Sequence, residues 1–292
     1  MKLHVGQAIL TGDLGRYSRR FDLLEVRSDP GKLPRLSKLR KWSSEVPEGF
    51  VFSLLLPRGC STLESDKASS EALGQALEAT EALGAGWVVL QTPPSVTPTA
   101  RSRERLAAFV EKLPRSERRI GWEPRGLWQD DEAEELASKL GVSLIRDISR
   151  SPAPASPIVY SRLRALGSAA RLRMSAIERA AQELASASEA YVVIEGPGAV
   201  RATALLRELA LEQAEYPHES ARSAVLGDLG RAVEAEVDGD YLEDDESEDG
   251  GLDDDEFEDD EFDDELQGGG SSDDFDDEAS DELDAPSKRR DF

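Results

Sequence analysis

The sequence predicts an α/β protein, a single TIM-type (β/α)8 barrel followed by a long, disordered acidic tail. Eight short runs rich in β-branched and aromatic residues alternate with helically periodic segments, and such alternation indicates parallel βαβ units. Several runs, among them VFSLLL and WVVL, are continuously apolar, as parallel strands covered by helices on both faces are. Eight units favour closure into a barrel over a doubly wound open sheet, which is the alternative. The expected strands are Leu3–Ile9, Phe21–Arg27, Phe50–Leu56, Trp87–Gln91, Arg119–Glu123, Ser143–Asp147, Ile158–Leu163 and Tyr191–Glu195.

The segments between the strands repeat apolar residues at the spacing of one helix face. The sets that begin at Leu106, Ala133 and Ala202 each place apolar residues at i, i+3, i+4 and i+7. The set that begins at Leu73 is incomplete, because Thr80 takes its fourth place. Helices are therefore expected at all four sets, with the least support at Leu73.

Local signals mark where some of these helices begin and end. Gly84 and Gly141 follow helical segments directly, and glycine is the residue that favours the left-handed conformation at a helix C-terminus. Ser175 and Asp131 each precede a glutamate by three residues, a pattern that resembles a capping box. We therefore expect helices to end at the two glycines and to begin at Ser175 and Asp131.

Charge divides the chain into two parts. The last 52 residues, 241–292, hold 26 acidic and three basic side chains, whereas residues 1–240 hold 34 acidic and 32 basic ones. A segment as charged as 241–292 cannot bury enough apolar surface to offset its ordering entropy. We expect the barrel in residues 1–215, a boundary segment with room for one short helix at 216–240, and a disordered tail at 241–292.

Composition excludes several classes of protein. Cys60 is the only cysteine, so no intrachain disulfide can form. No apolar run approaches the roughly 20 residues that span a bilayer, and the first residues lack a signal-peptide pattern, so a cytoplasmic protein is expected. His4 and His218 are the only histidines, too few for a multi-zinc site. No metal ligands and no cofactor are assigned, although an oxygen-ligated Mg²⁺ or Mn²⁺ site is left open.

Two segments carry a resemblance to a known family. VVLQTPPSV at 88–96 resembles the strand-and-loop signature of the YecE-like family (domain of unknown function 72), and IGWEPRGLW at 120–128 resembles its Glu-x-Arg segment with a following Trp. Other strand segments follow the order of the family over roughly residues 3–212. The resemblance implies a TIM-type barrel. It implies no reaction, because the biochemical function of the family is not established.

The chain also departs from the pattern of that family. Leu55 stands where the family usually has Lys, and Gly126 and Arg164 stand where it has His. Glu195 and Gly196 replace a pair of Asn residues at the eighth strand. The resemblance therefore carries over no activity that depends on those Lys, His and Asn side chains.

Polar side chains stand at the carboxyl ends of most of the expected strands, the face where (β/α)8 barrels place their chemistry. Glu123, Glu25 and Asp147 are the expected catalytic residues, as acid, base or hydrogen-bonding groups. Glu123 and Arg125 are the favoured pair, because i, i+2 spacing on a strand directs both side chains to one face. The expected ligand-binding residues are Arg125, Gln91, Arg27, Arg162, Trp128, Glu195, Gly196 and Gly198.

Each of these assignments has an alternative interpretation. The strand-end acids and arginines could pair with one another and plug the barrel mouth, since buried carboxylates need cationic or hydrogen-bonding partners. Trp128 is equally consistent with packing against a helix. Gly196 and Gly198 precede a helix and could expose backbone N–H groups to a phosphate, but Gly-Pro-Gly is also an ordinary turn.

The function that the sequence favours is binding of, or action on, a small polar, anionic ligand at the carboxyl-end face. The alternative is a non-catalytic interaction protein whose acidic tail recruits a basic protein partner. The sequence does not decide whether the protein is an enzyme. A more specific hypothesis is that the tail folds back and screens the arginine-lined mouth. The net acidity of the whole chain argues against direct binding of nucleic acid.

Overall fold

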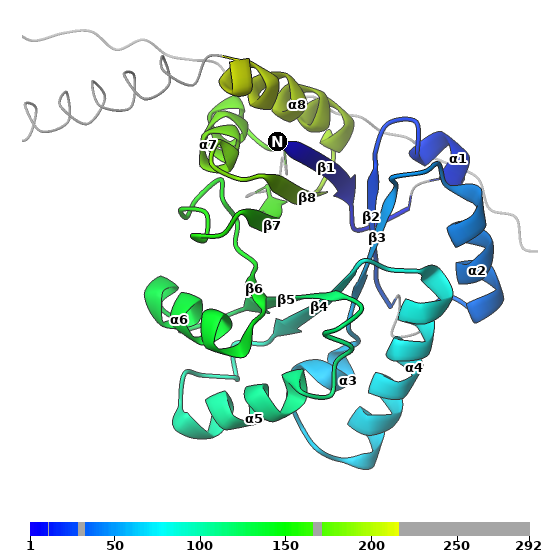
Figure 1. Ribbon diagram of the computed structural model, residues 1–292, viewed down its shortest axis with the longest axis vertical. Coiled ribbons are helices and arrows are strands. Elements are labelled where there is room, and N and C mark those ends of the chain that lie inside the picture. The colour runs from blue at the N-terminus through cyan, green and yellow to red at the C-terminus, as the bar shows by residue number, and fades with distance from the viewer. Residues whose placement is uncertain (11, 29–32, 166–170, 216–292) are drawn as a thin grey trace, which may run out of the picture. The chain divides into compact units, whose positions relative to one another are not determined.

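The computed structural model describes residues 1–10, 12–28, 33–165 and 171–215 (Figure 1). The expected boundary segment at 216–240, the expected tail at 241–292 and His218 lie outside these residues. No helix in the described part of the chain is long and apolar enough to cross a membrane.

Eight parallel strands form a single sheet, and all eight runs predicted from the sequence are strands (Figure 1). The pairing of each strand with the next places the carboxyl ends of all strands at the same end of the sheet. The strands are β1 (Lys2–Gln7), β2 (Leu23–Val26), β3 (Val51–Leu55), β4 (Trp87–Thr92), β5 (Arg119–Pro124), β6 (Ser143–Leu144), β7 (Ile158–Arg164) and β8 (Glu189–Glu195).

The sheet curls into a nearly closed barrel. Its order is β6-β5-β4-β3-β2-β1-β8-β7, so closure requires β6 to meet β7. A single parallel bridge between Arg146 and Ser161 makes that connection, and the Arg162 N–H donates to the Arg146 carbonyl at 3.1 Å. The barrel prediction is therefore confirmed, and the alternative of a doubly wound open sheet is excluded.

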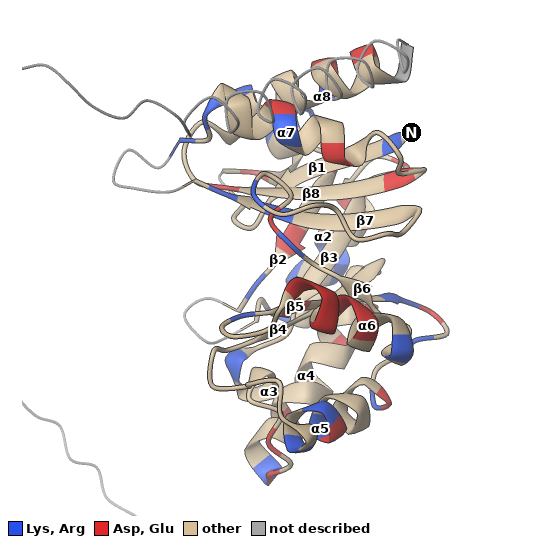
Figure 2. Cartoon of the chain, turned by 90° about the vertical axis from the view of Figure 1, so that its left-hand side faces the viewer, with Lys and Arg blue, Asp and Glu red and all other residues tan. Residues whose placement is uncertain are grey.

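Helices surround the strands, with α7 and α8 on one side of the barrel and α4 and α5 on the other (Figure 2). The apolar sets that begin at Ala133 and Ala202 lie in α6 and α8, as predicted, and the set that begins at Leu106 lies in α5 except for Leu113, which follows that helix. The helices are α1 (Leu14–Tyr17), α2 (Leu36–Glu45), α3 (Arg58–Ser61), α4 (Lys67–Leu83), α5 (Ala100–Val110), α6 (Asp130–Leu140), α7 (Met174–Leu184) and α8 (Ala199–Glu215).

Helix α4 carries a hydroxyl side chain within the apolar set on its buried face. Leu73 and Ala76 are buried as expected, and Thr80 occupies the fourth place of the set with 2% of its surface exposed. The Thr80 hydroxyl donates to the Ala76 carbonyl at 2.8 Å, so the polar group is satisfied within the helix. Gly84 ends α4 and Gly141 ends α6, both with φ of 64°, which confirms the two predicted C-termini.

The two predicted capping boxes are wrong. Helix α6 begins one residue before Asp131, with Gln129 as its N-cap, and α7 begins one residue before Ser175, with Arg173 as its N-cap. Neither cap residue makes a side-chain hydrogen bond to its helix. The acidic side chains in the first turn of α6 compensate electrostatically for the missing cap.

Apolar side chains fill the inside of the barrel at the level of the strand centres. Trp87, Tyr160 and Tyr191 are the largest of them, and the Trp87 ring lies edge-on to both tyrosines, 5.0 and 5.1 Å away. Leu23 and Val193 pack against the same group. A second, larger apolar cluster lies between the strands and the helices. Charged side chains replace this apolar filling at the carboxyl end of the barrel, which is where the candidate site lies.

Candidate functional site

Arg162 of β7 lies at the centre of the barrel mouth and is fully buried. Its guanidinium meets glutamates from three other strands: Nη2 lies 2.7 Å from Glu25 Oε2 and Nη1 lies 3.1 Å from Glu195 Oε1. Nε lies 3.1 Å from Glu123 Oε2, although this contact is not aligned as a hydrogen bond. Strands β2, β5 and β8 are thus tied to β7 through one cation.

Glu25 is the most enclosed of these glutamates, with no exposed surface. Besides Arg162, it accepts hydrogen bonds from the Tyr160 hydroxyl at 2.9 Å and from Arg27 Nε at 2.9 Å. The Tyr160 hydroxyl also lies 2.8 Å from Ser53 Oγ. Burial, followed by the charge of Glu25, raises the pKa of Tyr160 well above its ordinary value, so this hydroxyl stays protonated. Glu25 is therefore saturated by donors and closed to solvent.

The outer layer of the network consists of Arg164, Arg27 and Glu195. Arg164 bridges Glu123 and Glu195, with its Nε 3.2 Å from Glu195 Oε2, and Arg27 also contacts Glu195. Burial raises the pKa of Glu195, but the hydrogen bond and charge of Arg27 and the charges of Arg162 and Arg164 outweigh it. The result is a pKa of about 2. Glu195 is consequently an anion at any ordinary pH.

Gln91 and Arg125 approach the network from its β4 and β5 side. Gln91 Nε2 donates to Glu123 Oε2 at 2.8 Å. Arg125 Nε lies 3.9 Å from Glu123 Oε1, and 44% of the Arg125 side chain is exposed. Burial and then the like charge of Arg164 lower the pKa of Arg125 from its ordinary value. Glu123 and Arg125 are therefore neighbours, but Arg125 is held loosely at the opening.

Asp147 lies apart from the three glutamates and holds the backbone that follows β6. Its Oδ1 accepts from the Ser149 N–H at 3.1 Å, and its Oδ2 accepts from the Arg164 N–H at 3.1 Å. Arg150 Nε lies 3.6 Å from the same Oδ2. The described residues contain no cluster of His, Cys, Asp and Glu arranged to hold a metal ion.

Trp128 and the two glycines after β8 have local structural roles. Trp128 Nε1 donates to the Val96 carbonyl at 2.7 Å, and its ring packs edge-on against Trp122 with centroids 5.0 Å apart. Gly196 and Gly198 have φ of 106° and 81°, backbone conformations that favour glycine. Trp128 therefore has packing contacts in this structure. Gly198 also lines a cavity that is described below.

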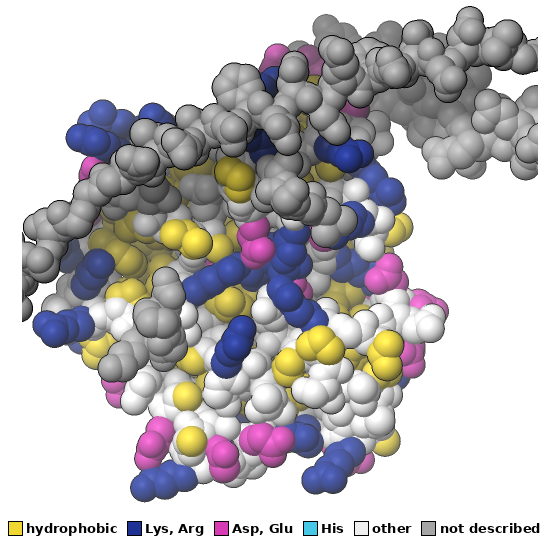
Figure 3. All heavy atoms as spheres, turned by 180° about the vertical axis from the view of Figure 1, so that it is seen from behind, with side chains coloured by type: hydrophobic (Ala, Val, Ile, Leu, Met, Phe, Trp, Pro, Cys, Tyr) yellow, Lys and Arg dark blue, Asp and Glu magenta, His cyan; other side chains and the backbone are white. Residues whose placement is uncertain are grey.

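A cavity of about 490 Å³ opens beside this network, between the loops after β6 and β7 and the start of α7. We call it the arginine cavity, because five arginines and no acid line it among the residues that the structure describes. Arg171, Arg173 and Arg179 form no ion pair with any residue in the described part of the chain. Basic side chains also gather at the centre of this face in the space-filling view (Figure 3). The polar lining residues are Ser149, Arg150, Arg164, Arg171, Arg173, Ser175 and Arg179.

Most of these arginines were missed by the sequence reasoning. Arg150, Arg171, Arg173 and Arg179 lie in loops or on a helix, not at the strand ends that were inspected. The one sequence signal was the density of basic residues between β7 and α7, where Arg171 and Arg173 are separated by a single leucine.

Comparison with solved structures supports the fold. A DUF72 family protein from Enterococcus faecalis V583 is 16% identical, with 71% of this chain and 95% of that chain covered and a TM-score of 0.58. A DUF72 family protein from Thermotoga maritima MSB8 is 15% identical, with 72% and 99% covered and a TM-score of 0.54. A family 2 AP endonuclease from Brucella melitensis is 10% identical, with 71% and 98% covered and a TM-score of 0.50. At these identities the likeness concerns the fold alone.

The sequence comparisons agree with the resemblance found in the motifs. No curated protein sequence matches the chain. A family model described as "Protein of unknown function DUF72" matches residues 9–224, which is most of the chain and includes every strand from β2 to β8. The chain belongs to the DUF72 family.

Proposed function

We propose that the chain binds a small anionic molecule in the arginine cavity at the carboxyl-end face of the barrel. The observation that carries the proposal is a cavity of about 490 Å³ whose described lining holds five arginines, two serines and no acid. Guanidinium groups recognise phosphate and carboxylate oxygens through paired hydrogen bonds. A bound anion would also relieve the mutual repulsion of cations that have no acidic partner among the described residues.

The neighbouring glutamates support this binding role. Glu123 and Glu195 both pair with the Arg164 guanidinium and fix its position at the cavity wall. Arg164 therefore loses little conformational entropy when a ligand binds. Glu25 pairs with Arg162, which is fully buried and does not line the cavity. In this proposal Glu123 and Glu195 are positioning residues. The acid–base role expected for Glu123, Glu25 and Asp147 stays a prediction, and the saturation of Glu25 by donors favours binding over catalysis.

The test is calorimetric titration of the full chain with inorganic phosphate and pyrophosphate at low ionic strength. Replacing Arg173 and Arg179 together by glutamine removes from the cavity two cations that form no ion pair within the described part of the chain. Hydrogen bonds to charged groups contribute roughly 1.5–3 kcal/mol each, so the dissociation constant should rise at least about tenfold. Arg101→Gln is the matched control, because Arg101 is exposed on α5, away from the cavity, and should leave binding unchanged.

Two results would contradict the proposal. One is the absence of binding of either anion to the unaltered chain at millimolar concentration. The other is a loss of binding free energy in the double variant, which removes two charges, that is no more than twice the loss in Arg101→Gln, which removes one, because that would reduce the effect to net charge. Unfolding curves of both variants verify that any loss of binding does not arise from loss of the fold.

A further inference from the structure

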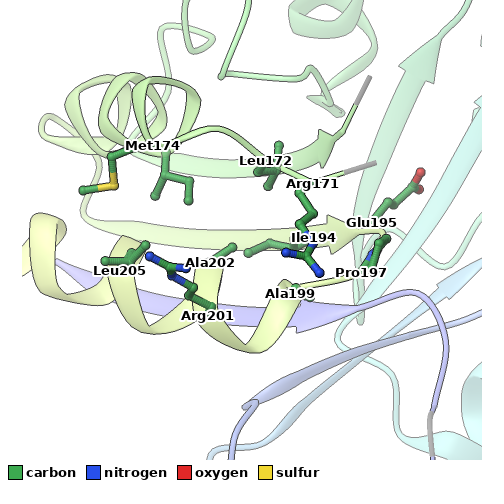
Figure 4. A pocket seen from close by; sticks show the side chains of 12 residues that line it. Arg171, Leu172, Met174, Ile194, Glu195, Pro197, Ala199, Arg201, Ala202 and Leu205 are labelled. Carbon is green, nitrogen blue, oxygen red and sulfur yellow. The ribbon is translucent and has the colours of Figure 1, made fainter. Parts of the chain in front are cut away.

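A second cavity, of about 250 Å³, lies between α7 and α8 next to the arginine cavity. We call it the α7–α8 cleft. Ile177, Ile194 and Ala202 form a buried apolar floor, and Met174 and Leu205 lie toward one end of it (Figure 4). Met174 is 46% exposed, so an apolar side chain meets solvent at that end of the cleft. The described part of the chain thus leaves an apolar surface open at this point.

The α7–α8 cleft and the arginine cavity share part of their lining. Arg171 and Leu172 line both of them. Figure 4 shows Arg171 near Glu195 and Pro197, at the end of the cleft opposite Met174. A molecule that reached from one cavity into the other would therefore pass Arg171.

The charged groups of the α7–α8 cleft that are not already in ion pairs with described residues are cationic. Arg171 and Arg201 form no ion pair with any described residue, although both line the cleft. Glu195 is the one acid among the described lining residues, and its carboxylate already binds Arg27, Arg162 and Arg164. The cleft consequently combines an apolar floor with cations at its rim.

We propose that the anion bound in the arginine cavity is a phosphate monoester with an apolar group, and that this group lies in the α7–α8 cleft. The inference rests on the proposed function and narrows its ligand to one chemical class. A bare phosphate ion would satisfy the arginines but would leave the apolar floor open to water. A short aliphatic chain or a small ring attached to the phosphate would cover that floor and leave the phosphate among the guanidiniums.

The experiment compares inorganic phosphate with methyl, propyl and pentyl phosphate, titrated into the full chain. Each buried methylene should tighten binding by up to about fourfold, so pentyl phosphate should bind at least tenfold more tightly than methyl phosphate. Pentanol, which has the chain without the phosphate, should bind far more weakly than pentyl phosphate.

Two variants test whether the apolar group of the ligand lies in the cleft. Ala202→Phe fills the floor, and Met174→Gln makes the exposed end polar without disturbing a buried position. Both should reduce the gain with chain length and leave the affinity for methyl phosphate within about twofold of the unaltered chain. Leu211→Gln is the control, because Leu211 is an exposed apolar residue of α8 that does not line the cleft.

The outcomes separate the two proposals. If inorganic phosphate binds but affinity does not increase with chain length, the inference about the cleft is overturned and the anion site stands. The same holds if the gain with chain length survives both Ala202→Phe and Met174→Gln. If neither inorganic phosphate nor any ester binds, the proposed function itself is overturned, together with the inference that rests on it.

Discussion

The two ends of the barrel use the same kinds of side chain in different ways. At the carboxyl end, Arg162 is fully buried and contacts three glutamates. At the amino end, Arg119 contacts one glutamate, Glu189, at 2.7 Å and donates to the Tyr191 hydroxyl at 2.6 Å, but 41% of its side chain is exposed. Because solvent screens an exposed pair, the amino-end contact stabilises little, whereas the carboxyl-end contacts cannot be replaced by water.

The surroundings of the two arginines differ as well. The Arg119 guanidinium lies over the Trp87 ring at 5.7 Å and over the Tyr191 ring at 5.5 Å, so it covers the apolar filling of the barrel. At the carboxyl end the arginines outnumber their acidic partners, and the surplus lines a cavity. The comparison teaches that one partly exposed ion pair covers the apolar layer at the amino end, whereas a buried network of several ion pairs lies beside the arginine cavity at the carboxyl end.

The largest expected difference between the two ends is in stability. Arg162→Met leaves three glutamates without their shared cation, and removal of one partner from a buried pair costs about 3–5 kcal/mol. Arg119→Met removes a partly exposed pair and should cost about 1 kcal/mol or less. Urea unfolding at pH 7 measures both free energies of unfolding. Equal losses in the two variants would show that burial does not distinguish the two ends.

Acid provides a second measure of the Arg162 variant. The charge of Arg162 helps to lower the pKa of Glu195 to about 2, so part of the deficit of Arg162→Met should be lost as the pH is lowered from 4.5 toward 2. A deficit that is constant over this range would mean that lost packing, and not stranded charge, causes the loss of stability.

The glutamates and arginines of the mouth could be predicted because regular strands carry them. Glu25, Glu123, Arg162 and Glu195 each lie at or near the carboxyl end of a predicted strand, and parallel strands bring such ends together. The sequence did not reveal which acid pairs with which arginine. That choice depends on the stagger of strands far apart in the chain, as in the contact of Arg162 with Glu25.

The arginine cavity could not be predicted in the same way. Arg150 lies in the loop after β6, where the Asp147 side chain accepts a hydrogen bond from the Ser149 N–H, and Arg171 and Arg173 directly precede α7, so strand register places none of the three. The two incorrect capping boxes have a related cause, because a local pattern of side chains does not fix where a loop enters a helix.

An effect of intermediate size is expected for Glu195. Its folded pKa of about 2 lies below the ordinary value of 4.5. A depressed carboxyl pKa contributes stability that is fully present above pH 4.5 and is lost as the pH falls toward 2. Glu195→Gln should therefore be less stable than the unaltered chain by roughly 1–3 kcal/mol at pH 7, and the two should converge between pH 4.5 and 2. Thermal unfolding across this range measures the convergence.

The matched control for Glu195 is at the other end of the barrel. Burial raises the pKa of Glu189, but hydrogen bonds from Tyr191 and Arg119 outweigh it and lower the pKa overall. Glu189→Gln should show a convergence of the same sign and smaller size, because its arginine partner is more exposed than Arg162. A larger effect at Glu189 than at Glu195 would reverse the ranking of the two ends.

The smallest effect is expected at His4 of β1, near the amino end. His4 stacks on Tyr191 with centroids 4.9 Å apart, and neither of its ring nitrogens has a hydrogen-bond partner among the described residues. Burial lowers the pKa of His4 below 6.5, although Asp22 and Glu189 lie 4.0 Å from its two ring nitrogens and favour the charged form. Lys2 opposes that charged form. Folding therefore favours the neutral form of His4.

His4→Phe keeps the stacked ring and removes the titration. At pH 8 its free energy of unfolding should lie within about 1.5 kcal/mol of the unaltered chain, as for other swaps of similar volume. A lowered histidine pKa means that the unfolded chain takes up its proton first, so the unaltered chain should lose stability relative to His4→Phe as the pH falls below 6.5. Parallel curves of stability against pH from 8 to 5 would show that His4 does not titrate differently on folding. Curves that diverge below pH 6.5 would mean that protonation of His4 destabilises the amino end. At that pH Glu195 is still ionised and still stabilises the carboxyl end.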